Sequence, residues 1–259
     1  MSDANLRELE RRWRVTGSVE DEAAWLWARL QAGDLSEERL ELSAYCGSKA
    51  ACSQVESAGP ESIEEWSAGL LRWGRPVVLR ALVSALRHAF ANLPGPQESA
   101  GASMAVVESA ILPRSLRTLG TMDDWILSPN EKARKKVSKS ASGLGRALDR
   151  LSEEQRERRR PVLYQRDRLG ARLTPRDRAV VIGARGAHQG IQIVTSNAPD
   201  QLEAVAATAV RQAALAVETV APNQGRRIAC SGVISWALGY SDPVRERVEA
   251  RQREAVDHD

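Results

Sequence analysis

Apolar side chains recur at helical spacing from the start of the chain, and glycines interrupt the pattern at short intervals. Leu6, Leu9 and Trp13 fall on one face of a helix, and this run stops at Gly17. Two similar runs follow, and each is closed by a further glycine. The pattern therefore predicts a module of three short helices over residues 1–47.

Serine residues mark the starts of the second and third of these helices. Ser18 is expected to cap the second helix, with Asp21 completing a variant of the capping box. Ser36 is expected to cap the third helix, and Leu35 and Leu40 flank it as a hydrophobic staple requires. Helices of this length are marginal in isolation, so they must pack on each other or on the rest of the chain.

The same periodicity continues to the end of the sequence, with prolines and glycines at the boundaries. It predicts an all-α fold, a bundle-like array of roughly 9–11 helices. One helix should follow Pro76 and end before Pro94, a second should lie around residues 104–112, and a short turn should form near residues 122–127. Later helices are expected to open near Pro199, Gly225 and Pro243.

Residues 179–195 leave two alternatives open, because β-branched residues stand on either side of three glycines. A short β-hairpin is one alternative, and a helix packed closely against a neighbour is the other; the surrounding helices favour the helix. The glycines, Gly183, Gly186 and Gly190, lack the lysine and hydroxyl residue of a P-loop and the spacing of a dinucleotide fingerprint. We therefore expect them to serve close packing or a bend.

Four successive segments describe the expected organisation, as one or two compact units. The first is an amino-terminal three-helix module at residues 1–47, packed on the rest, and the second is a helical middle region at residues 48–128. A basic helical region follows at residues 129–186, and carboxyl-terminal helices occupy residues 187–259.

Several blocks of the sequence resemble a known family. The amino-terminal segment LRELERRWRVTGSVEDEAAWLWARLQAGDLSEERLELSAYCG is similar to the "repeat-companion" helical module of uncharacterised myxobacterial and planctomycete paralogues. Later blocks resemble the same group, namely WSAGLLRWGRPVVLRALVSALRHAF, MDDWILSP and ISWALGYSDPVRERVEARQREA. In members of that group the block matched by residues 124–129 carries cysteines after a DWVL-like start, whereas this chain has no cysteine in that block. The resemblance implies no catalytic residue.

Positive charge is concentrated in one part of the chain. Residues 131–186 hold 17 Lys and Arg against 7 Asp and Glu, whereas the whole chain has a net charge of only +3. If residues 131–151 form one helix, its basic side chains share one side and its leucines and Val137 lie away from them. The stripe consists of Lys132, Lys136, Lys139, Arg146 and Arg150, and a second cluster follows at Arg156, Arg158, Arg159 and Arg160.

The basic stripe has three interpretations. It can meet an acidic protein surface, including that of a second copy; it can neutralise phosphates of a nucleic acid; or it can be a solvated face with no partner. Tyr164 is the one aromatic residue in the window for base stacking, which counts against nucleic acid. We therefore expect a non-enzymatic helical scaffold that binds another protein through charged surfaces. The alternatives are nucleic-acid association through residues 132–160 and a homo-oligomeric structural component.

Candidate chemistry is sparse elsewhere. The histidines are isolated, and the adjacent pair Asp123 and Asp124 would point apart on a helix, so no catalytic site is expected. Cys46 and Cys52 lack a nearby histidine and are expected to be small buried residues, with no metal and no cofactor. The tryptophans are expected to anchor helices in the core; they are Trp13, Trp25, Trp27, Trp66, Trp73, Trp125 and Trp236.

The cellular location is expected to be the cytoplasm. The first residues, MSDANLRELERR, are charged and do not resemble a signal peptide. No apolar run approaches the length of about 20 residues that crosses a bilayer, so no membrane partner is expected. Three cysteines are an odd number in a chain of 259 residues, which is typical of a reducing compartment.

Overall fold

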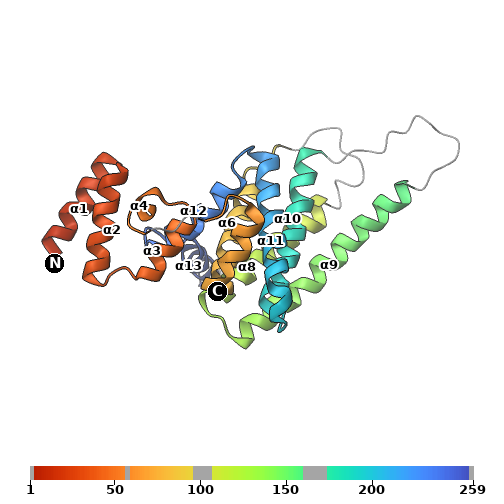
Figure 1. Cartoon of the computed structure of the whole chain (residues 1–259). Helices are drawn as coiled ribbons and strands as arrows, with labels where there is room; N and C mark the ends of the chain where they lie inside the picture. The colour runs from red at the N-terminus through yellow and green to blue at the C-terminus, as the bar shows by residue number, and fades with distance from the viewer. Residues whose placement is uncertain (1–2, 56–58, 96–106, 160–173, 257–259) are drawn as a thin grey trace. The chain divides into compact units, whose positions relative to one another are not determined.

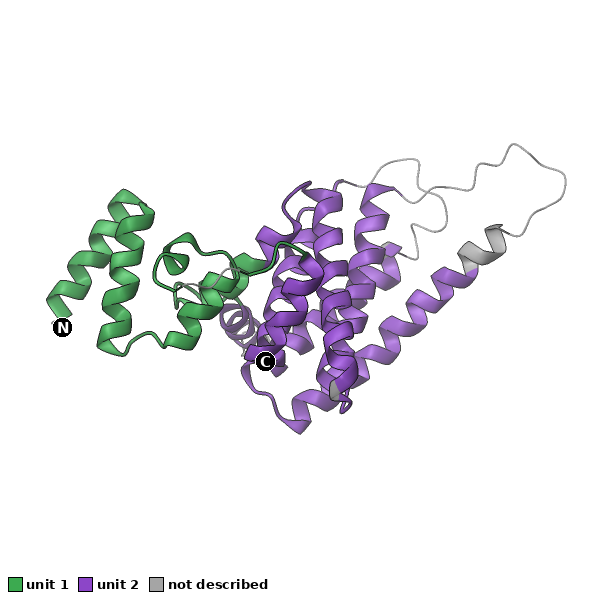
Figure 2. Cartoon of the chain, in the orientation of Figure 1, with its two compact units in different colours: residues 1–62, 230–243 green, residues 63–229, 244–259 purple. Residues whose placement is uncertain are grey.

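The computed structural model describes residues 3–55, 59–95, 107–159 and 174–256 (Figure 1). Within those ranges it contains twelve α-helices, one 3-10 turn and one π turn, and no strand. The all-α expectation is confirmed, and the count of twelve includes a four-residue helix, α4, that the sequence pattern did not indicate. The chain divides into two compact units, which Figure 2 colours separately.

Unit 1 comprises residues 1–62 and 230–243. Its helices are α1 (Asp3–Thr16), α2 (Val19–Ala32), α3 (Glu37–Tyr45) and α4 (Lys49–Cys52), joined by the end of α12 (Gly225–Ala237). The predicted caps are confirmed: the Ser18 hydroxyl accepts a hydrogen bond from the Asp21 amide at 3.1 Å, and Ser36 accepts one from the Arg39 amide at 3.3 Å. Gly17 adopts a positive φ of 62°, as a residue that ends a helix often does.

The capping-box role expected of Asp21 is wrong. Its carboxylate accepts a hydrogen bond from the Thr16 hydroxyl at 2.6 Å and pairs with Arg12 at 2.7 Å, while the Ser18 amide donates to Thr16 instead. The Thr16 bond, the largest of several influences, lowers the pKa of the Asp21 carboxyl. Asp21 therefore links α2 to α1 rather than satisfying the end of its own helix.

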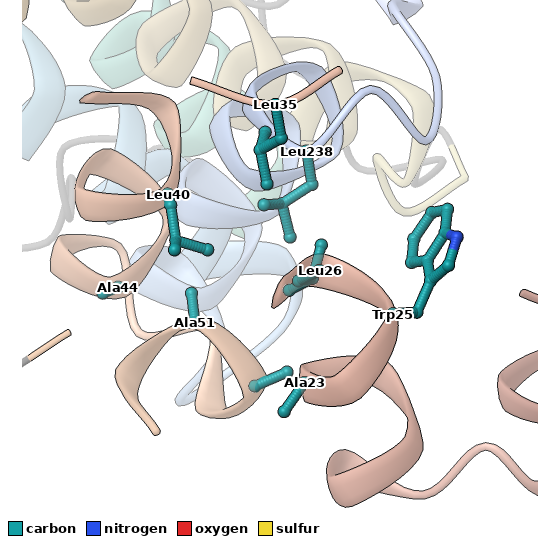
Figure 3. Packing of buried hydrophobic residues seen from close by; sticks show 9 residues of the cluster. Ala23, Trp25, Leu26, Leu35, Leu40, Ala44, Ala51 and Leu238 are labelled. Carbon is teal, nitrogen blue, oxygen red and sulfur yellow. The ribbon is translucent and has the colours of Figure 1, made fainter. Parts of the chain in front are cut away.

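The core of unit 1 is a small leucine and alanine cluster between α2, α3, α4 and the chain after α12. Leu26 and Leu40 are fully buried in it, together with Leu238 (Figure 3). Each fully buried leucine contributes about 1.5–3 kcal/mol relative to an exposed one. The staple residues Leu35 and Leu40 are both buried in this cluster, so they hold the start of α3 at the position that the sequence pattern predicted.

An aromatic stack extends that core. Trp13 stacks on Trp25 with ring centroids 4.8 Å apart, and Tyr240 stacks on Trp13 at 5.0 Å. The Tyr240 hydroxyl donates to Glu22, and the Arg29 guanidinium lies over the Trp25 ring at 4.7 Å. No described residue of α1 is fully buried, and Leu6 and Leu9 pack partly buried against the same core as Trp13.

Trp27 is an exception to the expectation that the tryptophans are core anchors. It is 46% exposed, whereas its neighbour Leu26 is fully buried. Cys52 is likewise exposed, contrary to expectation, whereas Cys46 and Cys230 are buried; these three cysteines form no disulfide.

Unit 2 comprises residues 63–229 and 244–259. Its elements are α5 (Ile63–Gly69), the 3-10 turn η1 (Leu70–Trp73), α6 (Arg75–Ala91), the π turn η2 (Val107–Ile111), α8 (Leu112–Leu127), α9 (Glu131–Arg159), α10 (Pro175–Thr195), α11 (Pro199–Val220), the start of α12 and α13 (Pro243–Val256). The central helix is α6, which packs against α8, α10 and α11 and buries most of its surface.

The stretch that could have been a hairpin is the helix α10, so the β-hairpin alternative is wrong and the helix is confirmed. Its glycines permit close packing, as expected. A Cβ at Gly190 would lie 2.5 Å from Leu82 Cδ2 of α6, and one at Gly186 would lie 3.2 Å from the Ala209 carbonyl of α11. At Gly186 the neighbouring atom is backbone, so a residue without a side chain lets α10 approach α11 closely; at Gly190 it leaves room for the Leu82 side chain.

The turn predicted near residues 122–127 is wrong. The helix α8 runs unbroken from Leu112 to Leu127, with Pro113 in its first turn, where a missing amide is tolerated. Its buried face includes Leu119, Met122 and Ile126 at helical spacing. Two small polar residues that precede them on the helix, Ser115 and Thr118, obscured this face in the sequence because their side chains are also buried.

No single described helix is long and apolar enough to cross a membrane. One bent pair, residues 200–220 with Gly225–Ala237, meets that test jointly by length and composition, at an angle of 117°.

Candidate anion-binding groove between α8 and α9

The basic stripe predicted from the sequence lies on one continuous helix. The helix α9 continues through Gly143 and Gly145, and Val137 and Leu144 are fully buried on its inner side. The five stripe residues are exposed on the other side; they are Lys132, Lys136, Lys139, Arg146 and Arg150. The expected helix, its buried face and its basic face are therefore confirmed as geometry.

The second predicted cluster falls largely beyond what can be described. The helix α9 includes Arg156, Arg158 and Arg159 by its backbone, but their side chains lie outside the described part of the structure. Arg160 lies outside the described residues altogether. No structural argument for a site rests on these four positions.

The neighbouring helix α8 brings further basic side chains to the same place. Arg114, Arg117 and Thr121 are spaced three and four residues apart, so they share one face of α8. The α9 residues Lys136 and Lys139 line the same hollow as these three. The sequence pattern did not indicate Arg114 and Arg117, because it assigned a helix only around residues 104–112 and a turn near residues 122–127. The signal for these two arginines was their spacing on an unbroken amphipathic helix.

Three hollows follow one another along the junction of α8 and α9. The first, of about 560 Å³, lies near Asp124, Lys132 and Arg251. The second, of about 320 Å³, lies between Arg117 and Lys139. The third, of about 510 Å³, includes Arg146 and Arg150.

These hollows form one groove, because neighbouring hollows share walls. Lys136 lines both the first and the second, and Arg114 and Gly143 line both the second and the third. The order also shows that α8 and α9 run antiparallel, since the start of α8 faces the later part of α9. We call this feature the α8–α9 groove, defined by the residues lining the three hollows.

The charge of the α8–α9 groove is strongly positive. Eight lysine and arginine side chains line it, and one carboxylate, Asp124, does so at one end. Asp124 is already paired with Arg251, at 3.0 Å. Among the described residues, no carboxylate pairs with Arg117 or with the five stripe cations of α9.

Beside the groove, Asp123 forms a buried ion-pair network. Its carboxylate is fully buried and accepts hydrogen bonds from Arg87 of α6 at 2.7 Å and from Arg247 of α13 at 2.8 and 3.2 Å. Burial lowers the pKa of the Arg87 guanidinium, an effect that the Asp123 charge opposes. Because arginines occupy both carboxylate oxygens, Asp123 anchors three helices and does not offer a free base to a substrate.

Comparisons with known proteins do not add to this site. A scan against family models, a search of curated proteins and a search of solved structures each find no match. The resemblance to the paralogue group stays a prediction. Within the described residues there is also no group of three or more His, Cys, Asp or Glu side chains that could hold a metal ion.

The chemistry that the groove supports is therefore anion binding. Lysine supplies a compact point charge, and arginine supplies a planar set of donors that matches carboxylates and phosphates. Like charges brought together in this way repel each other until an anion neutralises them. The packed helices α8 and α9 form the floor of the groove, and their lysine and arginine side chains line it.

Proposed function

We propose that this protein is a helical adaptor that binds an acidic segment of another protein along the α8–α9 groove. The observation that carries the proposal is the convergence of two basic stripes, from α8 and α9, on one groove. The one carboxylate that lines the groove, Asp124, lies at its end and is already paired with Arg251. Scattered surface lysines arise by chance, whereas two helices that present cations to the same hollow make a site of defined shape.

The lining of the groove favours protein over nucleic acid. None of the residues that line the three hollows is aromatic, so the groove offers no platform for base stacking. Apolar atoms of Leu127, Ala133 and Val248 line one end, where a side chain of a partner peptide can be buried. From Lys132 to Arg150 the helix spans about 27 Å at about 1.5 Å per residue. An acidic helix of similar length matches that span.

The test is affinity capture from native lysate with three forms of the tagged protein, each with and without nuclease. The groove variant carries Lys136→Gln, Lys139→Gln and Arg146→Gln. The matched control removes the same amount of charge from exposed residues outside the groove, through Lys135→Gln, Arg185→Gln and Arg253→Gln. Surface substitutions of this kind change stability by about 0.5 kcal/mol or less each, so both variants should fold.

The proposal predicts protein partners that survive nuclease, are released by moderate salt, and are lost from the groove variant but not from the control. Capture that is equal for both variants would contradict it. Nucleic acid that co-purifies with the wild type and the control, but not with the groove variant, would instead assign the groove to nucleic acid.

Self-association is a second candidate, favoured by an acidic ridge on unit 1. Asp34, Glu37, Glu38 and Glu41 are exposed at helical spacing around the start of α3. Unit 1 carries 13 acidic and 7 basic residues, whereas unit 2 carries 21 and 30. The ridge of one copy is therefore complementary in charge to the α8–α9 groove of another.

A further inference from the structure

We propose that the middle hollow of the α8–α9 groove binds a phosphoryl group, so that the acidic segment recognised by this protein is a phosphorylated one. The proposal rests on the proposed function and deepens it by naming the group that the partner presents. It concerns one part of the groove, the hollow of about 320 Å³.

Four cationic side chains and two hydroxyls surround this hollow. They come from two helices and from opposite walls, and no acidic residue lines it; they are Arg114, Arg117, Thr121, Lys136, Lys139 and Ser140. A carboxylate carries one negative charge, whereas a phosphorylated side chain carries about −1.5 to −2 at neutral pH and has three acceptor oxygens. Four converging cations match the phosphoryl group better in charge and in number of acceptors.

Several of these groups are held in place before any ligand arrives. Arg114 is half-buried, and one of its guanidinium nitrogens donates to the Ala110 carbonyl at 2.8 Å. The Thr121 and Ser140 hydroxyl oxygens lie 3.3 Å apart across the junction of α8 and α9. Each hydroxyl donates to a carbonyl of its own helix and can turn to donate to a phosphate oxygen.

Gly143 contributes by leaving the hollow open. A Cβ there would lie 3.9 Å from Arg114 Cδ and Nε, so a larger side chain at this position would take up space at the wall that two hollows share. At about 30 Å³ per water molecule, the middle hollow has room for about ten waters. A phosphoryl group can therefore enter together with the end of the side chain that carries it.

The residues on either side suit a peptide rather than a bare ion. Arg146 and Arg150 line the next hollow on one side, and Lys132 lines the hollow on the other. Acidic residues that flank a phosphorylated side chain would meet these cations in turn. Recognition of a phosphorylated acidic segment by clustered arginines is an established mode of peptide binding.

Three fluorescent peptides with the same acidic sequence test the proposal by anisotropy titration. Their central residue is phosphoserine, aspartate or serine. We expect the phosphoserine peptide to bind at least about tenfold more tightly than the aspartate peptide, since charge-assisted hydrogen bonds to arginine are strong. A single-stranded oligothymidylate serves as the phosphodiester probe.

Two single variants separate the middle hollow from the rest of the groove. Arg117 lines only the middle hollow, and Arg146 lines only the third. Arg117→Gln should abolish most of the preference for phosphoserine over aspartate. Arg146→Gln should weaken the binding of both peptides by the same factor. Both residues are exposed, so neither change should impair folding.

The pH dependence of peptide binding gives an independent test of the phosphoryl site. The second pKa of a phosphoryl group is about 6, and that of aspartate is about 3.9, while lysine and arginine stay charged. Lowering the pH from about 7.5 to about 5.5 should therefore weaken binding of the phosphoserine peptide several-fold and leave binding of the aspartate peptide nearly unchanged.

Each outcome decides between the proposals. Equal binding of the phosphoserine and aspartate peptides would overturn the phosphoryl site and leave the adaptor function standing. Binding of oligothymidylate alone would overturn both in favour of nucleic acid. Failure of every probe to bind would overturn the phosphoryl site, and it would overturn the groove as the binding surface as well.

Discussion

At the level of single residues, two buried or half-buried polar contacts join segments that are far apart in the sequence. In unit 2, Asp123 holds Arg87 and Arg247 to α8, with all three helices meeting at one carboxylate. In unit 1, Tyr240 joins the Trp13–Trp25 stack and donates its hydroxyl to Glu22. Neither contact follows from the local sequence pattern, because each joins residues more than thirty positions apart.

Removal of the Asp123 charge should lower the free energy of unfolding. Asp123→Asn leaves two arginines without their buried partner, and breaking a buried ion pair from one side typically costs about 3–5 kcal/mol. Asp124→Asn, at the half-buried neighbour that pairs only with Arg251, should cost less than about 1 kcal/mol. Urea unfolding of the two variants measures the difference, and equal losses would show that Asp123 is not the anchor.

Tyr240 should make the stability of the protein sensitive to alkaline pH. Burial, followed by the bond to Glu22, raises the pKa of the phenol well above its ordinary value. The stabilisation is complete below the unfolded-state pKa of about 10 and is lost as the pH rises above it towards the folded-state pKa.

The comparison uses Tyr240→Phe, which keeps the ring but does not titrate. From about pH 8 to about pH 10.5, the free energy of unfolding should fall by more for the wild type than for the variant. Parallel curves would rule out a titration of Tyr240 that is linked to folding.

At the level of elements, the sequence predicted helices well where caps and glycines bound a clear apolar stripe. Ser18, Ser36 and Gly17 lie at the helix ends that the pattern indicated. It failed at α8, where buried Ser115 and Thr118 interrupt the apolar stripe without interrupting the helix. Periodicity detects apolar residues, and it cannot recognise a buried hydroxyl that bonds to its own helix, as Ser115 does to Ile111.

The glycines of α9 and α10 should respond in opposite ways to alanine. At Gly143 a Cβ meets only ordinary contacts at 3.9 Å, so Gly143→Ala should raise the free energy of unfolding by about 0.5–1 kcal/mol through helix propensity. At Gly190 a Cβ would lie 2.5 Å from Leu82 and 2.9 Å from Met122, and overpacking should cost about 1–3 kcal/mol. Thermal or urea unfolding gives both values, and a stabilising Gly190→Ala would disprove the close packing.

For the whole molecule, the chain shows an uneven distribution of charge that the sequence revealed only in part. The excess of basic residues and the stripe on α9 were predictable, since they depend on residue counts and helical geometry alone. The α8–α9 groove was not predictable, because Arg114 and Arg117 join it only when α8 packs antiparallel to α9. A site formed between helices needs the tertiary arrangement, which periodicity does not supply.

Self-association through opposite charges makes a prediction of its own. If the acidic ridge of one copy binds the α8–α9 groove of another, light scattering after gel filtration should give a mass above 28.3 kDa at low salt. The mass should fall to that of one chain as salt screens the contact. A mass of one chain at every protein concentration and ionic strength would eliminate this candidate.

Hydrogen exchange on the captured complex locates the bound partner on the protein. If the partner lies in the α8–α9 groove, amide exchange should be slower than in the free protein in peptides that cover α8 and the first half of α9. Peptides from α2 and α3 in unit 1 should exchange at the same rate in both states. Protection confined to unit 1, with α8 and α9 unchanged, would contradict the assignment of the α8–α9 groove as the binding surface.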